Sequence, residues 1–228
     1  MSTTPDPTEQ QPHADADHGA ERVSLYVPRV LQQNIADHPD RRWWTATGTA
    51  AFVDISGFTK LSEQLARKGR EGAEQITEVI GRSFESILQV AYDRGGSLLK
   101  FGGDALLLWF EGEGHVERCA HATLSMREVL DDVGRIELPD AQVTLQMSQG
   151  VHAGEFHFFA VGASHTELIP TGPGWSRLVA MEQTASAGEI LLSTEAAELL
   201  PAACAGEAKG PGRLLAAAPG EAPKLPLV

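Results

Sequence analysis

Apolar and polar residues follow one another along the chain in patterns that predict short strands and amphipathic helices. Apolar runs bounded by Gly, Ser or Asp predict strands, because such runs fit the interior of a sheet. Apolar residues recur every three or four positions over residues 71–93, which predicts an amphipathic helix of about six turns. The same reasoning predicts strands at 49–55, 98–101, 105–110, 143–152, 156–161, 167–171 and 188–192, and helices at 59–68, 116–130, 175–182 and 194–200.

The order of these elements predicts an α+β fold, in which helices flank a mixed or antiparallel sheet of ferredoxin-like type. A strand is followed by two helices, two strands, a helix and two further strands, with more helix and strand after them. The Gly102-Gly103 pair indicates a tight hairpin. The residues Ala153-Gly154-Glu155 are expected to separate a second pair of strands.

Composition divides the chain into four expected segments. Residues 1–22 are polar and acidic and contain almost no large apolar side chains, so we expect a disordered leader. Residues 23–46 are expected to form a short helix after Pro28 and a linker, and residues 47–200 the main domain. Residues 201–228 are rich in Pro, Gly and Ala, which predicts a tail or a linker.

Charge and cysteine content exclude some classes of function. The net charge of −13 argues against a nucleic acid polymer as partner, because phosphate binding needs clustered Lys and Arg. It leaves open a nucleotide bound through a metal ion, which brings its own positive charge. The chain has no apolar stretch of the ~20 residues that span a bilayer, no basic-then-apolar N-terminus, and too few cysteines for a disulfide framework. We therefore expect a soluble cytoplasmic protein without a transmembrane segment.

Two aspartates stand at the ends of apolar strands. Asp54 follows the run 50–53, and Asp104 precedes the run 105–109. A carboxylate inside a run suited to a sheet interior is costly to bury unpaired. If the hairpin that carries Asp104 lies beside the first strand, the two carboxylates converge and favour a site for two divalent ions, Mg²⁺ or Mn²⁺. The alternative is that Asp54 only caps the turn that follows it.

Two further features favour a charged ligand near these aspartates. Gly57, Phe58 and Thr59 stand where a strand turns into a helix, and the backbone N–H groups at a helix start attract anions such as a polyphosphate. Gly57 permits close approach of the backbone, or else merely breaks the strand. Lys100 lies in an otherwise apolar strand, where it either lies at a sheet edge or points into a cleft toward a polar ligand.

These segments resemble a known family. FVDISGFT (52–59) and GGSLLKFGGDALLLWF (95–110) resemble the class III adenylyl and guanylyl cyclase catalytic domain, and the resemblance continues through 150–154 to GEILLS (188–193). It is closest to the first, metal-binding domain of the tandem, soluble, bicarbonate-responsive adenylyl cyclases, which has a similar ILKFxGDALL stretch.

The resemblance implies roles for individual residues. Asp54 and Asp104 would hold two metal ions, with the carbonyl of Ile55 as an additional ligand. The backbone of residues 57–59 would bind the β and γ phosphates. Lys100 would contact the base in a symmetric cyclase, whereas in a first-half domain it would line a pseudosite for an activator anion such as bicarbonate.

The sequence departs from the family on the helix before GEIL. The family carries Gly-Asp-x-Val-Asn-x-Ala-x-Arg there, in which the Asn orients the ribose and the Arg stabilises the transition state. This chain has Ser176 in place of that Asn and Ala180 in place of that Arg, and its base-selecting position is Ile169. Arg177 lies nearby but three residues out of register.

Two functions are compatible with this pattern. The first is the metal-bearing half of a nucleotidyl cyclase, which forms cyclic AMP and pyrophosphate from ATP, or acts on GTP. A second cyclase domain, in cis or in trans, would supply the base and transition-state contacts, so a homodimer is expected to be weak or inactive. The alternative is a catalytically degenerate cyclase-homology module that binds a nucleotide or an anion and regulates a partner.

Overall fold

The computed structural model describes residues 27–66, 70–138, 141–162 and 166–221, and the chain divides into two compact units, 1–40 and 41–228. The first unit contains helix α2 (Arg29–Asp37), as predicted for the segment after Pro28. The carbonyl of Pro28 accepts the N–H groups of Leu31 and Gln32, which starts the helix. The predicted leader, residues 1–22, lies outside the described residues.

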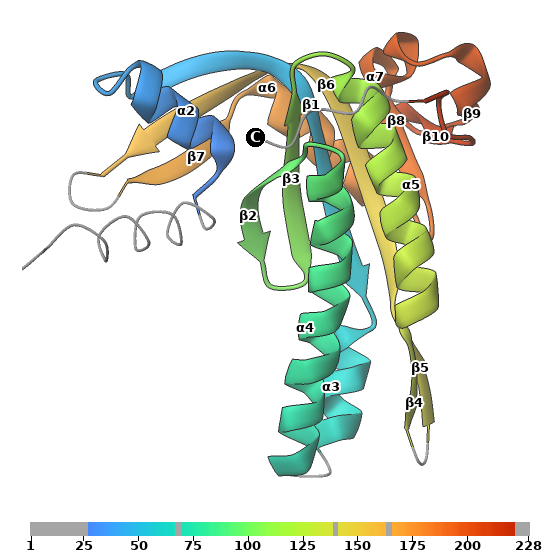
Figure 1. Cartoon of the computed structure of the whole chain (residues 1–228). Coiled ribbons are helices and arrows are strands. Elements are labelled where there is room, and N and C mark those ends of the chain that lie inside the picture. The colour runs from blue at the N-terminus through green and yellow to red at the C-terminus, as the bar shows by residue number, and fades with distance from the viewer. Residues whose placement is uncertain (1–26, 67–69, 139–140, 163–165, 222–228) are drawn as a thin grey trace, which may run out of the picture. The chain divides into compact units, whose positions relative to one another are not determined.

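The second unit is built on one large sheet (Figure 1). Its strand order is β2-β3-β1-β6-β8-β10-β9, and β7 also pairs with β6. The strands are β1 (Trp43–Ser56), β2 (Ser97–Gly102), β3 (Ala105–Glu111), β6 (Gln146–Val161), β7 (Glu167–Thr171), β8 (Ile190–Ser193), β9 (Ala205–Lys209) and β10 (Gly212–Leu215). The helices of this unit are α3 (Phe58–Ala66), α4 (Arg70–Asp93), α5 (His115–Val133), α6 (Pro173–Thr184) and α7 (Thr194–Leu199), with a short 3₁₀ helix at Ala202–Cys204.

The strand order confirms the predicted fold class. The four strands β6-β1-β3-β2 pair antiparallel, and β1 and β2 are separated by β3, as in a ferredoxin-like sheet. The pairing of β6 with β8 is parallel, so the sheet is mixed. None of the helices that the structure describes is both long and apolar enough to cross a membrane.

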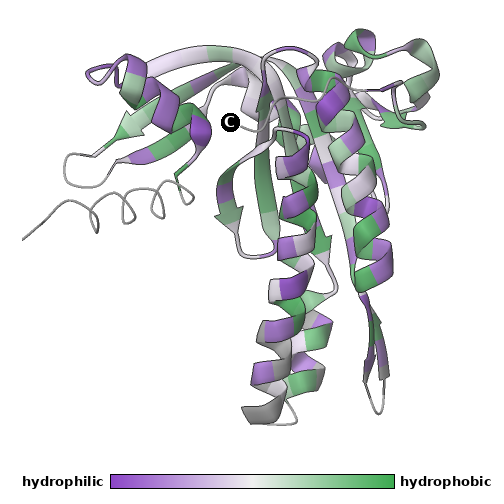
Figure 2. Ribbon diagram, in the orientation of Figure 1, coloured by the Kyte–Doolittle hydropathy of each residue, from purple (hydrophilic) through white to green (hydrophobic). Residues whose placement is uncertain are grey.

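The alternation of side chains along β1 gives the sheet two different faces. Val53 and Ile55 belong to the main core, which also contains apolar residues of α4 and α5 such as Ile87 and Met126. Asp54, between Val53 and Ile55, therefore faces the opposite side of the sheet. Figure 2 shows the apolar central strands and the mixed polar and apolar surfaces of α4 and α5.

The opposite face of the sheet is covered by α6 and by a cluster of aromatic rings. Trp175 of α6 lies 4.6 Å from the ring of Phe156 and 5.7 Å from that of Phe158, measured between ring centroids. Trp109 of β3 contacts the same two rings edge to face. Such aromatic pairs add to the burial of apolar area, so this cluster fixes the first half of α6 on the sheet.

Four segments differ from the sequence-based expectation. Residues 43–46, expected to belong to a linker, form the start of β1 and pair with β6. The pair of strands expected around Gly154 is a single strand, β6, because Gly154 stays in the ladder opposite Gly48 of β1. A hairpin that was not predicted, β4 (Arg135–Leu138) with β5 (Ala141–Thr144), precedes it. Part of the segment expected to be a tail forms β9 and β10, and β10 pairs with β8. Strands β9 and β10, with five and four residues, are too short to give a clear alternating pattern.

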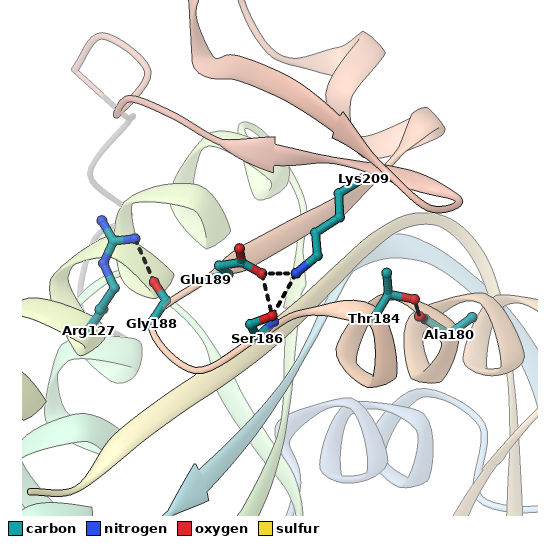
Figure 3. A network of polar contacts seen from close by, with 7 residues as sticks. All are labelled: Arg127, Ala180, Thr184, Ser186, Gly188, Glu189 and Lys209. Atoms are coloured by element: carbon teal, nitrogen blue, oxygen red, sulfur yellow. Dashed lines mark hydrogen bonds and ion pairs between the residues drawn. The ribbon is translucent and has the colours of Figure 1, made fainter.

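Polar contacts hold the loop after α6 between β9 and α5 (Figure 3). The ammonium group of Lys209 forms an ion pair with Glu189 and donates to the Ser186 hydroxyl at 2.8 Å. Arg127 of α5 donates to the carbonyl oxygen of Gly188 at 3.1 Å. The hydrogen bond from Lys209 lowers the pKa of Glu189. The loop that follows α6 is thus fixed from two sides.

The backbone of α6 approaches β6 most closely at Gly150. A Cβ atom at this position would lie 2.4 Å from the backbone nitrogen of Glu182 and 2.8 Å from the carbonyl oxygen of Leu178. Both neighbours are backbone atoms, so a side chain here must displace the helix. We expect Gly150→Ala to lower the free energy of unfolding by about 3 kcal/mol, measured by chemical denaturation.

Gly81 provides a matched control for this substitution. It lies in α4, and a Cβ atom there would meet no atom within 4 Å. Gly81→Ala is expected to raise the free energy of unfolding by about 0.5–1 kcal/mol, because Ala is a better helix former and restricts the unfolded chain. Equal effects at the two positions would contradict the close approach of α6 to β6.

Candidate functional site

The structure places Asp54 of strand β1 next to Asp104 of the β2–β3 hairpin turn. Asp54 lies near the end of β1, directly opposite Ala105 of β3, and Asp104 is the residue before Ala105 in the turn between β2 and β3. The N–H of Ile55 donates to the backbone carbonyl oxygen of Asp104 at 3.1 Å. The hairpin therefore lies beside the first strand, and the sheet itself fixes the spacing of the two aspartates.

The two carboxylates are in different surroundings. Asp54 is half-buried, and its burial raises its pKa, with a further rise from the negative charge of Asp104. Asp104 is exposed. Their mutual repulsion would be relieved by a cation, and carboxylate oxygens are donors that Mg²⁺ and Mn²⁺ prefer. The donor set thus fits a hard divalent ion.

Two carboxylates do not complete a metal site by themselves. Among the residues that the structure describes, no three His, Cys, Asp or Glu side chains are grouped as ligands for one ion. An ion held by Asp54 and Asp104 would keep several positions for water or for the oxygens of a phosphate, which is the usual arrangement for Mg²⁺ at nucleotide sites.

The chain turns from β1 into α3 directly beside Asp54. Gly57 has a φ of +104°, and a Cβ atom there would lie 3.0 Å from the carbonyl oxygen of Thr144. The carbonyl of Gly57 accepts the N–H of Leu61, so the N–H groups of Phe58 and Thr59 belong to the first turn and have no partner within the helix. Such groups attract anions. The side chain of Thr59 lies outside the described residues.

A first groove, of about 490 Å³, lies between α3, α4 and the β2–β3 turn. Phe58 is buried at its base and stacks on Phe84 of α4 with ring centroids 5.6 Å apart. Asp104 and Gly103 line the groove from the turn, and Glu63 lines it from α3. The groove therefore opens beside one of the two carboxylates.

A second groove, of about 350 Å³, lies on the α6 face of the sheet and is mostly apolar. It is lined by Phe52, Gly102, Ala105, Leu107, Pro170, Trp175, Leu178 and Val179, together with Lys100. The Lys100 ammonium lies 3.4 Å from a carboxylate oxygen of Glu167 on β7. Lys100 thus lies on the edge strand β2 and also lines a groove. No sequence pattern indicated Glu167 as its partner.

Helix α6 and strand β7 carry the positions at which the sequence departs from its resemblance. Ser176 is exposed and Ala180 is half-buried, both on α6. Arg177 donates to Glu195 of α7 at 2.5 Å, so its guanidinium is engaged by α7. Ile169 is 41% exposed and lies opposite Phe159 in the β6–β7 ladder. The structure gives Arg177 a partner that the sequence could not indicate.

Sequence reasoning missed a third carboxylate near Asp54. Glu182, in the last turns of α6, is half-buried and accepts a hydrogen bond from the Ser148 hydroxyl at 3.2 Å. Ser148 lies directly opposite Asp54 in the β1–β6 ladder. Burial raises the pKa of Glu182, the Ser148 hydrogen bond lowers it, and the charge of Asp54 raises it. No pattern in the sequence marks Glu182, since only the packing of α6 on β6 brings it to Asp54.

Known cyclases match this chain in sequence. A family model described as the adenylate and guanylate cyclase catalytic domain matches residues 46–214. Adenylate cyclase type 10 from Homo sapiens is 25% identical over 179 residues, which are 75% of this chain and 11% of the human protein. Its counterpart from Oryctolagus cuniculus is 45% identical over 103 residues, 41% of this chain and 6% of that protein. The chain thus spans a small part of the curated relatives that it matches.

Solved structures share the fold. The adenylyl cyclase CyaB from P. aeruginosa has a TM-score of 0.63 and 21% identity, and the match covers 82% of this chain and 100% of that chain. The guanylate cyclase domain of RhGC from Catenaria anguillulae, determined in complex with GTP, has a TM-score of 0.57 and 17% identity, covering 76% of this chain and 93% of that chain. At these identities the similarity concerns the fold.

Proposed function

Because this chain belongs to the adenylate and guanylate cyclase catalytic domain family, we propose that it is the metal-bearing half of a nucleotidyl cyclase. The reaction is the conversion of ATP to 3′,5′-cyclic AMP and pyrophosphate, with GTP as the alternative substrate. The observation that carries this proposal is the proximity of Asp54, near the end of β1, to Asp104, in the adjacent β2–β3 turn, beside the start of α3.

Each residue of this region has a role in the proposal. Asp54, Asp104 and the carbonyl of Ile55 bind Mg²⁺ or Mn²⁺, and the backbone of Gly57, Phe58 and Thr59 binds the β and γ phosphates. Two divalent ions held there would offset the triphosphate charge and lower the pKa of the ribose 3′-hydroxyl. The 3′ oxygen then bonds to the α phosphorus, its proton passes to solvent, and pyrophosphate leaves with the bridging oxygen.

The proposal also requires a second cyclase domain, in cis or in trans. Ser176 and Ala180 offer neither an amide to orient the ribose nor a guanidinium for the transition state. Arg177 lies three residues out of register and pairs with Glu195 of α7. Arginines that stabilise the transition state of phosphoryl transfer contribute about 10³-fold or more in rate, so the chain alone is expected to be a weak enzyme.

The test is cyclic nucleotide formation from ATP and from GTP with Mg²⁺ or Mn²⁺, by the chain alone and mixed with candidate second domains. At least one mixture is expected to exceed the chain alone by about 10²-fold or more. Asp54→Asn should abolish that gain. The enzyme proposal fails if no mixture turns over and if Asp54→Asn changes the activity of no partner.

The second candidate function is a degenerate module that binds an anion, such as bicarbonate, or a nucleotide, and regulates a partner. The observation that favours it is Lys100, which lies on the groove rim with the carboxylate of Glu167 as its partner. An entering anion would replace that carboxylate. Calorimetry separates the two functions: ATP binding that requires metal and is lost in Asp104→Asn supports the cyclase. Metal-independent anion binding that strengthens in Glu167→Gln supports the module.

A further inference from the structure

Helix α6 places one acidic side chain over the same stretch of sheet that carries Asp54. The close approach at Gly150 sets the backbone of Glu182 directly against β6. Gly150 lies opposite Phe52 in the ladder, two residues before Asp54 on β1. Because Phe52 and Asp54 share one face of β1, Glu182 lies on the side of the sheet toward which Asp54 points.

The Ser148 hydroxyl then holds the carboxylate of Glu182 beside Asp54. It donates to Glu182 at 3.2 Å, and Ser148 is the residue directly opposite Asp54. Within the described residues, no cationic side chain forms an ion pair with Glu182. A half-buried carboxylate next to a second carboxylate is unfavourable by itself, since like charges at close range repel.

A neutral side chain would serve the packing of α6 equally well. Glutamine has the same length as Glu182, and its amide oxygen accepts the same hydrogen bond from Ser148. The negative charge at this position is therefore not explained by the contact between helix and strand. A divalent cation at Asp54 and Asp104 does explain it, because the carboxylate of Glu182 would then be attracted by the cation as well as repelled by Asp54.

We propose that Glu182 is a positioning residue of the metal site, whose charge, oriented by Ser148, strengthens divalent ion binding at Asp54 and Asp104 without coordinating the ion. This inference rests on the proposed function. The three carboxylates do not form a ligand cluster among the described residues, so Glu182 acts on the ion by the electrostatic attraction of its charge and not as a ligand. A nearby unit charge at a partly buried site is expected to change the affinity for a divalent ion about tenfold.

The test compares wild type and Glu182→Gln, as the whole chain, in titrations with Mn²⁺ followed by electron paramagnetic resonance. Thermal unfolding is measured without metal and with Mn²⁺. Glu182→Gln is expected to weaken Mn²⁺ binding about tenfold and to leave the metal-free Tm unchanged or higher. Unchanged Mn²⁺ affinity, or a metal-free Tm that falls, overturns the inference, because a purely structural role predicts those results.

Three variants make the result specific. Glu198→Gln removes the same charge from the exposed surface of α7 and is expected to leave Mn²⁺ affinity unchanged. Glu182→Asp keeps the charge and is expected to bind Mn²⁺ within about threefold of wild type, whether or not Glu182→Gln folds. Asp54→Asn is expected to abolish Mn²⁺ binding. If it does not, the proposed metal site is itself overturned, whereas loss in Asp54→Asn with no change in Glu182→Gln overturns only the role of Glu182.

Discussion

Replacing Asp104 with asparagine is expected to weaken metal-dependent ATP binding about 100-fold or more, because the site loses one of its two charged oxygen donors. The change should not disturb the fold. The Asp104 side chain is exposed, and the hydrogen bond that joins the hairpin to β1 uses its backbone carbonyl. Isothermal titration calorimetry with ATP and Mn²⁺ measures the effect.

Glu63→Gln is the matched control for this variant. Glu63 lines the same groove from α3 and also has an exposed side chain, so its substitution removes the same charge from the same region. ATP binding is expected to stay within about twofold of wild type, as is usual for an exposed charge that contacts no ligand. Equal losses in both variants would mean that net charge, and not coordination, governs ATP binding.

The pH dependence of stability gives Asp104→Asn a second readout. Burial and the Asp104 charge raise the pKa of Asp54, so the folded chain holds this proton more tightly than the unfolded chain does. The contribution of Asp54 to stability therefore falls as pH rises from the usual pKa of Asp through the raised value. Asp104→Asn should make this fall smaller in chemical denaturation with a chelator present, and a larger fall would contradict the proximity of the two carboxylates.

The combined variant Ser176→Asn with Ala180→Arg is expected to raise the cyclase activity of the chain alone by about 10²- to 10³-fold. These substitutions restore the ribose-orienting amide and the transition-state guanidinium at the positions that the family resemblance identifies. Both positions lie on α6, and neither is fully buried. The measurement is the rate of cyclic nucleotide formation with Mn²⁺.

Two further variants serve as controls in that experiment. Ser176→Asn with Ala180→Met adds a long side chain without a guanidinium, and no gain in rate is expected from it. Asp54→Asn in the Ser176→Asn, Ala180→Arg background should cancel the gain, because the metal-binding half is then lost. A gain that survives Asp54→Asn would show that the activity arises elsewhere.

The central fold and the aspartate pair could be predicted because periodicity determines them. The repeat over residues 71–93 predicts one long helix, and α4 occupies Arg70–Asp93. Asp54 and Asp104 flank apolar runs, and the register of a strand with one buried face is fixed by its apolar residues. Once the hairpin lies beside β1, as the ferredoxin-like order requires, the two aspartates have to meet.

Contacts between distant elements could not be predicted in this way. The Glu182–Ser148 hydrogen bond depends on where α6 rests on β6, and the Lys100–Glu167 pair depends on how far β7 extends along β6. Periodicity identifies the face of a helix that is buried, but not the strand residue that this face meets. Arg177 illustrates the same limit, since its partner Glu195 belongs to another helix.

The long pairing of β1 with β6 limits how the sheet can move. The ladder runs without interruption from Trp43 opposite Phe159 to Ser56 opposite Gln146. A slip by one residue would turn every side chain to the wrong face, so sliding of the two strands is forbidden. Gly48 and Gly154 lie opposite each other within this ladder, and glycines in strands often mark bends. We therefore expect any bending of the β1–β6 pair to concentrate at these two glycines, while the pairing beside Asp54 keeps its register.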